Sequence, residues 1–131
     1  DNKSFFAGVA RQVRWALYCA VLPASWYVLT GTFDLTSGGQ MTITYKGPGG
    51  VHLQLQEGAY CTAGDSSCQP RVQALGPTLF GDQTGTLYTL EPGYAVYVNP
   101  GSTPPSWAAA SVDLDETTFV KLVAALHRVQ P

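Results

Sequence analysis

The feature that most constrains the fold is the stretch from residue 40 to residue 57, which reads QMTITYKGPGGVHLQLQE. Apolar and polar residues alternate on both sides of its Gly-Pro-Gly-Gly cluster, and this period of two is typical of strands that bury one face. The cluster itself is typical of a turn. The stretch therefore predicts two antiparallel strands, whose apolar residues are Met41, Ile43 and Tyr45, followed by Val51, Leu53 and Leu55.

The register of this predicted hairpin follows from its two apolar sets, because both must lie on the same face of the sheet. We predict that Tyr45 pairs with Val51 across a five-residue loop, residues 46–50. A four-residue loop would place the two sets on opposite faces. The remaining apolar pairs of the predicted register are Ile43 with Leu53 and Met41 with Leu55.

Composition bounds the class of protein. A chain of 131 residues fits a single domain, residues 1–131, and can bury roughly two-thirds of its unfolded surface. It is 45% hydrophobic and 12% charged, with a net charge of −2 and seven scattered Lys and Arg residues. Because nucleic-acid binding needs a basic stripe or patch, we expect no nucleic-acid partner.

Several features favour an extracytoplasmic location, in the cell envelope or secreted. Low charge combined with many Gln, Ser and Thr residues is typical of such proteins. No run of 18 apolar residues is present, so we expect no membrane insertion by this segment. The sequence starts at Asp1 rather than Met, and Tyr18 is too bulky to precede a lipoprotein processing site at Cys19. We expect any membrane anchor to lie upstream of Asp1.

The N-terminal region, residues 1–15, allows two interpretations. It forms either a mobile arm or a short helix. The helix would extend slightly past this region, with an apolar face made by Phe5, Val9, Val13 and Ala16. Residues 14–21 could equally be an extended apolar segment that ends at Leu22 and Pro23, because Pro23 disfavours helix in the residue before it.

Further strands are predicted at residues 26–33, 79–80, 85–90, 94–99 and 106–112. The first of them carries apolar side chains on both faces, which is typical of a strand that is central or covered on both sides. A Glu-Pro-Gly turn joins residues 85–90 to residues 94–99. We predict Leu90 opposite Tyr94, which places Tyr88 with Val96 and Val98 on one face and Leu87 with Tyr97 on the other.

Residues 113–128 predict an amphipathic C-terminal helix. Asp113 and Glu116 have capping-box spacing, and His127 and Arg128 in a last turn would suit the helix dipole. The apolar stripe consists of Phe119, Leu122, Val123 and Leu126. The chain is therefore predicted to be an α+β domain, with one twisted antiparallel sheet of about six or seven strands, this helix packed on one face, and a short N-terminal helix as an option.

Two of the three cysteines suggest a disulfide. Cys61 and Cys68 enclose six residues rich in Gly, Asp and Ser, within an irregular region at residues 58–76. In an oxidising compartment a disulfide would clip this loop. Free thiols in a cytosolic chain are the alternative, while a zinc site would need closer spacing and a fourth ligand. Cys19 lies in an apolar segment and is expected to be a buried thiol rather than a nucleophile.

No catalytic, cofactor-binding or metal-binding residue is predicted. His52 falls on the polar face of its strand and His127 at a helix end, which are typical places for solvated or capping residues. The sequence has no nucleophile elbow, phosphate-binding loop or zinc-binding helix motif. Glu57 and Asp82 lie at strand ends near turns, where no partner can be identified. We therefore expect neither a cofactor nor enzymatic activity.

Aromatic residues are the remaining candidates for binding. Leu87 and Tyr97 share the less apolar face of their predicted hairpin and would form a contact patch if that face were exposed. The alternative is that a second layer of structure covers both side chains.

Three short motifs stand out: Leu-Pro-Ala-Ser-Trp-Tyr at residues 22–27, Tyr-Lys-Gly-Pro-Gly-Gly at residues 45–50, and a final helix that starts with Asp-Leu-Asp-Glu. Together they resemble a class of bacterial extracytoplasmic domains found in predicted lipoproteins and in the outer portions of membrane-anchored regulators similar to anti-sigma factors. Ser25 stands where that class usually has Gly, and the Cys61 to Cys68 insertion has no counterpart. The resemblance spans residues 20–128. It implies a bacterial envelope location and a curved antiparallel sheet, and it brings no catalytic residues.

These observations favour a non-catalytic extracytoplasmic binding or sensing module, whose partner is a protein or a small apolar ligand. A second hypothesis is a carrier that encloses a lipid or another apolar ligand between sheet and helix, which requires a large apolar cavity. A third is a hydrolase with a dispersed site, which requires a perturbed carboxylate or His in a cleft.

Overall fold

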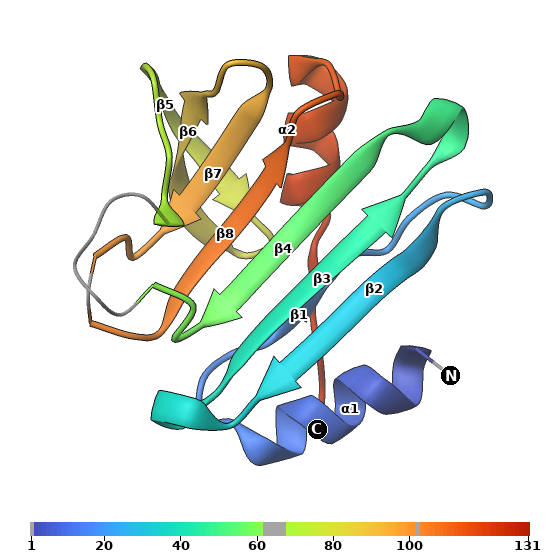
Figure 1. Ribbon diagram of the computed structural model, residues 1–131, viewed down its shortest axis with the longest axis vertical. Helices are drawn as coiled ribbons and strands as arrows, with labels where there is room; N and C mark the ends of the chain where they lie inside the picture. Colours follow the sequence, from blue (N-terminus) through green and yellow to red (C-terminus); the bar gives the residue numbers. More distant parts are fainter. Residues whose placement is uncertain (1, 62–67, 102) are drawn as a thin grey trace.

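The computed structural model describes residues 2–61, 68–101 and 103–131 and confirms an α+β fold (Figure 1). A seven-stranded antiparallel sheet has the order β2-β3-β4-β8-β7-β6-β5, and β1 pairs with β9 in a separate two-stranded ribbon. The helices are α1 (Asn2–Gln12) and α2 (Glu116–Ala124), with 3-10 turns at Thr36–Gly38 and Pro48–Gly50. The strands are β1 (Tyr18–Cys19), β2 (Tyr27–Asp34), β3 (Gln40–Lys46), β4 (His52–Gly58), β5 (Ala74–Phe80), β6 (Gln83–Thr89), β7 (Tyr94–Val98), β8 (Ser106–Ser111) and β9 (His127–Arg128).

The central hairpin, β3 and β4, buries the face that the sequence predicts, but its register is shifted by two residues. Tyr45 pairs with Leu53 and Lys46 with His52, so the loop is residues 47–51 rather than 46–50. The Gly47 N–H donates to the Val51 carbonyl oxygen at 2.8 Å. The predicted register was wrong because a slip of two residues leaves every side chain on its own face, and the apolar pattern cannot detect it.

The turn also explains how the two strands can pair as far as Lys46 and His52. The Trp26 ring lies directly over Gly47, where an added Cβ would come within 2.4 Å of the indole. Glycine at this position therefore lets an aromatic side chain from the preceding segment cover the end of the hairpin. Gly49 and Gly50 take positive φ values of 74° and 81°, a conformation that disfavours other residues.

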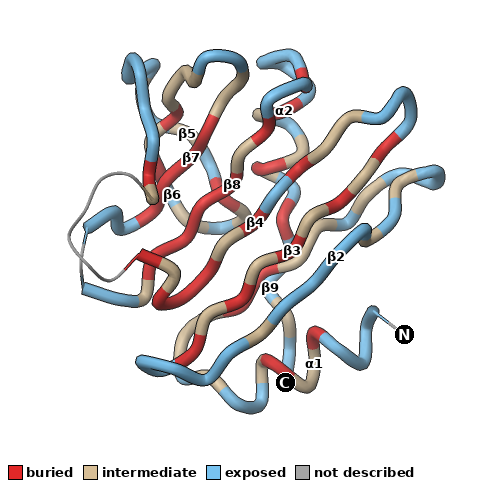
Figure 2. The backbone as a smooth tube through the Cα atoms, in the orientation of Figure 1, coloured by how far each residue is buried: buried red, intermediate tan, exposed pale blue. Residues whose placement is uncertain are grey.

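Strand β2 lies at the edge of the sheet, so the prediction of a central or doubly covered strand was wrong (Figure 2). Tyr27 is 51% exposed and Leu29 is 45% exposed, whereas Val28 and Phe33 on the other face are half-buried. Apolar residues on both faces occur in covered strands and also in edge strands with an exposed apolar face, so this pattern does not distinguish the two.

The β6–β7 hairpin is offset by one residue from the predicted register. Thr89, not Leu90, lies opposite Tyr94, because the Leu90 N–H donates to the Gly93 carbonyl oxygen within the turn. A one-residue slip exchanges the faces of one strand relative to the other. Leu87 therefore lies with Val96 in the main core, and Tyr88 lies on the outer face.

The C-terminal helix packs on one face of the sheet as predicted, next to β5 and β7. Phe119 and Val123 are fully buried, Leu126 is buried and Leu122 is half-buried. The predicted cap was wrong: Asp115 is the N-cap residue, and its Oδ2 accepts a 3.0 Å hydrogen bond from the Thr118 N–H.

The helix is also shorter than predicted. It ends at Ala124, and His127 and Arg128 leave it to form β9. There Arg128 pairs with Tyr18 and His127 with Cys19. These two residues seemed suited to a helix end, but backbone pairing with a strand more than a hundred positions earlier takes precedence.

The N-terminal region is helical over Asn2–Gln12, which resolves the choice between an arm and a short helix. Phe6 and Val9 are buried, while Phe5 is 38% exposed and Val13 and Ala16 follow the helix. In Figure 1, α1 lies beside β2 at the edge of the sheet. Neither helix in the described part of the chain is long and apolar enough to cross a membrane.

The cap gives a direct test of the helix boundary. Asp115→Ala should lower the free energy of unfolding by about 1 kcal/mol, because it removes the acceptor for the Thr118 N–H. Glu116→Ala should cost less than about 0.5 kcal/mol, as is usual for an exposed position without a cap bond. Urea unfolding of both variants measures the difference. A larger loss in Glu116→Ala would restore the capping-box interpretation.

Candidate functional site

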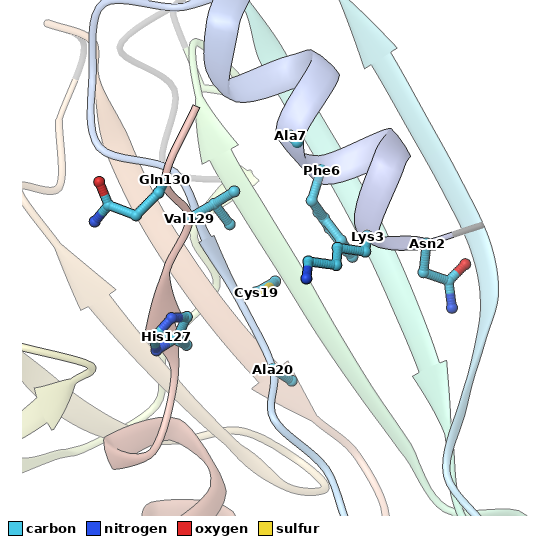
Figure 3. Close-up of a pocket in the computed structure, with 9 residues that line it drawn as sticks. All are labelled: Asn2, Lys3, Phe6, Ala7, Cys19, Ala20, His127, Val129 and Gln130. Atoms are coloured by element: carbon cyan, nitrogen blue, oxygen red, sulfur yellow. The ribbon is translucent and has the colours of Figure 1, made fainter.

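A hollow of about 370 Å³ lies between α1 and the β1–β9 ribbon, and we call it the α1 hollow (Figure 3). Most of its surface is apolar, and its size falls in the range of small-molecule sites. Its lining residues come from the two ends of the chain: Asn2, Lys3, Phe6, Ala7, Cys19, Ala20, His127, Val129 and Gln130.

Helical periodicity and strand pairing build the α1 hollow. Residues four apart on a helix share a face, so Lys3 and Ala7 line it together. On the other side, β1 and β9 pair Cys19 directly with His127. The Val129 N–H then donates to the Leu17 carbonyl oxygen at 2.8 Å, which keeps the following residues beside the ribbon.

The ribbon is fixed to the sheet by side chains. Glu57 Oε1 accepts a 2.7 Å hydrogen bond from the Tyr18 N–H, and the Tyr45 hydroxyl accepts one of 3.0 Å from the Ala20 N–H. The Trp107 indole N–H donates to the Ala16 carbonyl oxygen at 2.8 Å. These bonds hold the floor of the hollow, which carries Cys19, at a set position above the sheet.

Glu57 is the chemically unusual residue near this floor. It continues the alternation of β4, so it faces the core and is completely inaccessible to solvent. Its Oε2 has no hydrogen-bond partner among the described residues. Burial raises the pKa of Glu57 well above its ordinary range, and the bond from the Tyr18 N–H offsets this only in part. Burial therefore favours the protonated form of this carboxyl group over the charged form.

Cys19 is a free thiol with partial access to the hollow. Burial raises its pKa, and the nearby Glu57 raises it further. Since the thiolate is the nucleophilic form, this thiol is protonated at neutral pH and weakly reactive. The thiol is half-buried rather than buried as predicted, and its chemistry is that of a soft, apolar lining residue.

Tyrosine hydroxyls complete the buried polar groups near the ribbon. The Tyr18 hydroxyl donates to Asp82 Oδ1, so Asp82 has a partner that the sequence did not reveal. Burial, together with this carboxylate, raises the pKa of Tyr18 to about 12. Burial also raises the pKa of Tyr45. Both phenols are neutral at physiological pH and serve as fixed hydrogen-bond groups.

A second polar group joins His52 at the start of β4 to Asp113 after β8. The His52 N–H donates to Asp113 Oδ1 at 2.8 Å, and its Nδ1 lies 3.2 Å from Oδ2. Ser111 Oγ donates to Asp113 Oδ1 at 3.1 Å. Burial alone would raise the pKa of Asp113, but the bonds from His52 and Ser111 outweigh it and lower the pKa.

This group does not have the geometry of a hydrolytic triad. The Ser111 hydroxyl bonds the carboxylate rather than the imidazole, and it also accepts from the Leu114 N–H at 3.0 Å. A nucleophile needs its base within hydrogen-bond reach. The side chains of His52 and Asp113 are 39% and 34% exposed, so the pair connects two loop ends at the surface.

The proposed contact patch at Leu87 and Tyr97 is not present. The two residues lie on opposite faces of the sheet and are both buried, at 7% and 3% exposure. A second layer covers Tyr97: its hydroxyl donates to the Pro70 carbonyl oxygen at 2.6 Å. The Arg71 guanidinium lies 5.3 Å from the Tyr97 ring centre. The prediction failed because the register that placed the two residues together is off by one.

The disulfide between Cys61 and Cys68 is present, with Cα atoms 5.8 Å apart. The residues that it encloses, which the sequence predicts to be irregular, lie outside the described ranges. Within those ranges, no group of three or more His, Cys, Asp or Glu side chains is arranged to hold a metal ion.

Comparison with known proteins adds no assignment. A scan against protein-family models, a search of curated proteins and a search of solved structures each gave no match.

Sequence reasoning missed the α1 hollow and the buried position of Glu57. The signal for Glu57 was available, because the alternation of Leu53 and Leu55 continues to residue 57. The hollow had no such signal, since Lys3 was assigned to an arm or helix and His127 to a different helix. On the ribbon side, Cys19 and His127 meet through the pairing of β1 with β9.

The buried acid predicts a specific pH dependence. With a raised folded pKa, Glu57 keeps its proton in the folded state above its ordinary value of 4.5 and loses it on unfolding. Stability should therefore fall as pH rises above about 4.5, by up to about 1.4 kcal/mol per pH unit, until the folded pKa is reached. Glu57→Gln retains an acceptor for the Tyr18 N–H and cannot ionise, so its profile should lack this slope.

Urea unfolding of both forms from about pH 5 to about pH 8 measures the difference. Glu116→Gln, an exposed substitution of the same type, serves as the control and should keep the slope. Parallel profiles for the parent chain and Glu57→Gln would show that Glu57 is ionised in the folded protein.

Proposed function

We propose that this protein is a non-catalytic extracytoplasmic module that binds or senses a small apolar ligand in the α1 hollow. The observation that carries the proposal is the hollow itself, with Phe6, Ala20 and Val129 in its lining and polar side chains such as Asn2 and Gln130 around them. A mostly apolar concavity with a few polar groups is the usual form of a small-molecule site.

Two observations support the extracytoplasmic part of the proposal. The Cys61–Cys68 disulfide is of a kind that persists in oxidising compartments and is rare in the cytosol. The sequence motifs also resemble bacterial envelope domains of predicted lipoproteins and anchored regulators. On this proposal the chain presents its hollow outside the cytoplasm, and a bound ligand or protein partner is the signal that it receives.

Binding is favoured over carriage of a lipid. Between α2 and the sheet, Phe119 and Val123 are fully buried and belong to the main hydrophobic core. The α1 hollow is of modest volume, and its lining residues include exposed ones such as Asn2 and Lys3. A carrier must shield its cargo from water, whereas a recognition site can leave one side of its ligand exposed.

Hydrolysis is the least favoured function. The strongly perturbed carboxylate, Glu57, has no surface that a substrate can reach. The His52–Asp113 pair is exposed, and the neighbouring Ser111 hydroxyl bonds the Asp113 carboxylate instead of the His52 imidazole. A dispersed active site requires a group that is both perturbed and accessible in a cleft. Glu57 has the perturbed pKa but no access, and the His52–Asp113 pair has access but no positioned nucleophile.

A neutral apolar dye, N-phenyl-1-naphthylamine, tests the site without supplying charge. Its fluorescence should rise saturably on binding to the parent protein. Ala7→Trp places a large side chain in the hollow and should abolish this signal, while Ser4→Trp adds the same side chain to an exposed position of α1 outside it. Equal binding by the parent and Ala7→Trp, or no binding by the parent, would refute the proposal.

Cys19 supplies a second readout, because it lines the hollow and is a free thiol. Alkylation by iodoacetamide should be slow in the folded chain, since the thiol is protonated at neutral pH and partly covered. Saturation with the dye should slow it further. The urea-unfolded chain is the control and should react at the same rate with and without dye. An unchanged rate in the folded protein would place the dye elsewhere.

A further inference from the structure

The two edge strands of the seven-stranded sheet, β2 and β5, differ in how well they can pair with a further strand (Figure 1). Edge strands of stable proteins are commonly protected by Pro, by bulges or by charged side chains. In β5, Pro77 has no N–H to donate, and a register shift interrupts the pairing between Ala74 and Gly76. The β5 edge therefore presents an interrupted row of backbone groups.

The β2 edge is open over residues 30–34. These residues follow the register shift at residues 28–30 and pair with β3 without a break. They contain no Pro or Lys, and their one charged residue, Asp34, stands at the end of the strand. Gly31 is exposed, and because it has no side chain, the exposed surface is its backbone.

Helix α1 lies beside this edge but on the inner side of the strand. A Cβ built on Gly31 would point at the Ile43 side chain and lie 3.8 Å from the Phe5 ring. A hollow of about 240 Å³ is found there, lined by Asn2, Phe5, Phe6, Val28, Gly31 and Ile43. Since Phe5 is 38% exposed, an apolar ring borders solvent next to unpaired backbone. An open edge with an adjoining apolar hollow is the usual form of a site for strand addition.

We propose that β2 pairs antiparallel with β2 of a second copy of this chain, about a two-fold axis at Thr32. In this register Thr32 lies opposite Thr32 of the second copy, Thr30 opposite Asp34, and Gly31 opposite Phe33. This inference concerns a surface other than the α1 hollow and goes beyond the proposed function.

The faces of β2 select this axis. Gly31 and Phe33 lie on the inner face, opposite the buried Ile43 and Met41 of β3. Antiparallel partners share a face, so Phe33 of the second copy would lie beside Gly31, at the hollow that Phe5 borders. An aromatic side chain opposite an edge glycine compensates for the missing side chain. An axis at Gly31 would instead set two glycines opposite each other.

The charges also agree with self-pairing. The Asp34 carboxylate would lie opposite the Thr30 hydroxyl of the second copy, and the two Asp34 residues would lie at opposite ends of the paired stretch. Like charges directly opposite each other are therefore avoided. Because the β5 edge is interrupted, association through β2 closes at a dimer.

Sedimentation velocity tests the dimer directly. A pair of edge strands is a small interface, so the parent chain should convert reversibly from monomers to dimers over roughly the micromolar to millimolar range, without larger species. Thr32→Lys places two like charges opposite each other and should weaken dimerisation about tenfold or more, and Thr32→Glu should do the same. An equal mixture of the two variants should recover dimers, because Lys then lies opposite Glu.

Gln54→Lys is the matched control. It makes the same charge change as Thr32→Lys at an exposed position of β4, on the outer face and away from the edge, and should dimerise like the parent chain. Circular dichroism of each variant establishes that it is folded.

Four results would overturn the inference. A parent chain that stays monomeric would leave the β2 edge to a strand of another protein. Unchanged dimerisation of Thr32→Lys would place the contact elsewhere. A mixture of folded Thr32→Lys and Thr32→Glu that stays monomeric would exclude an axis at Thr32. Equal weakening by Gln54→Lys would assign the effect to net charge.

Discussion

The structure depends on how the inner face of the central hairpin is covered. The segment that crosses this face, residues 15–20, has little regular structure, since β1 is two residues long. Backbone groups in such a segment must find partners when they are buried. Glu57, Tyr45 and Trp107 provide them from the sheet. Each bond contributes roughly 0.5–1.5 kcal/mol, but together they also decide where the β1–β9 ribbon lies. The ribbon in turn forms one wall of the α1 hollow.

The sequence was a good guide to which face of an element is buried and a poor guide to register. Alternation identified the inner face of β3 and β4, and helical spacing identified Phe119 and Val123. Neither pattern contains the position or the length of a turn. At residues 47–51 the slip of two residues was silent, but at Leu90 the slip of one residue exchanged faces and removed a predicted contact patch. Both errors therefore arise at turns, because the geometry of a turn sets the register of the two strands that it joins.

The candidate site was beyond sequence reasoning for a different reason. Its walls are the first two turns of α1, the two-residue strand β1 and the last few residues of the chain. Interactions between segments this distant leave no periodic signal, and two-residue strands are too short to carry one. Cys19 and His127 illustrate the point: they lie near opposite ends of the sequence, yet the pairing of β1 with β9 places them side by side in the lining of the hollow.

Perturbed ionisable groups often mark active sites, and Glu57 shows how that inference must be weighed against access. A catalytic acid has to reach a substrate, but every atom of Glu57 is covered, and one of its oxygens already holds the Tyr18 backbone. Its shifted pKa is a consequence of fixing an irregular segment to the sheet from within the core. On the proposed function, the groups that would meet a ligand are exposed polar side chains at the hollow, such as Asn2 and Gln130. Buried groups thus fix the position of the segment, and exposed polar ones would meet the ligand of the proposed function, a division that suits binding better than catalysis.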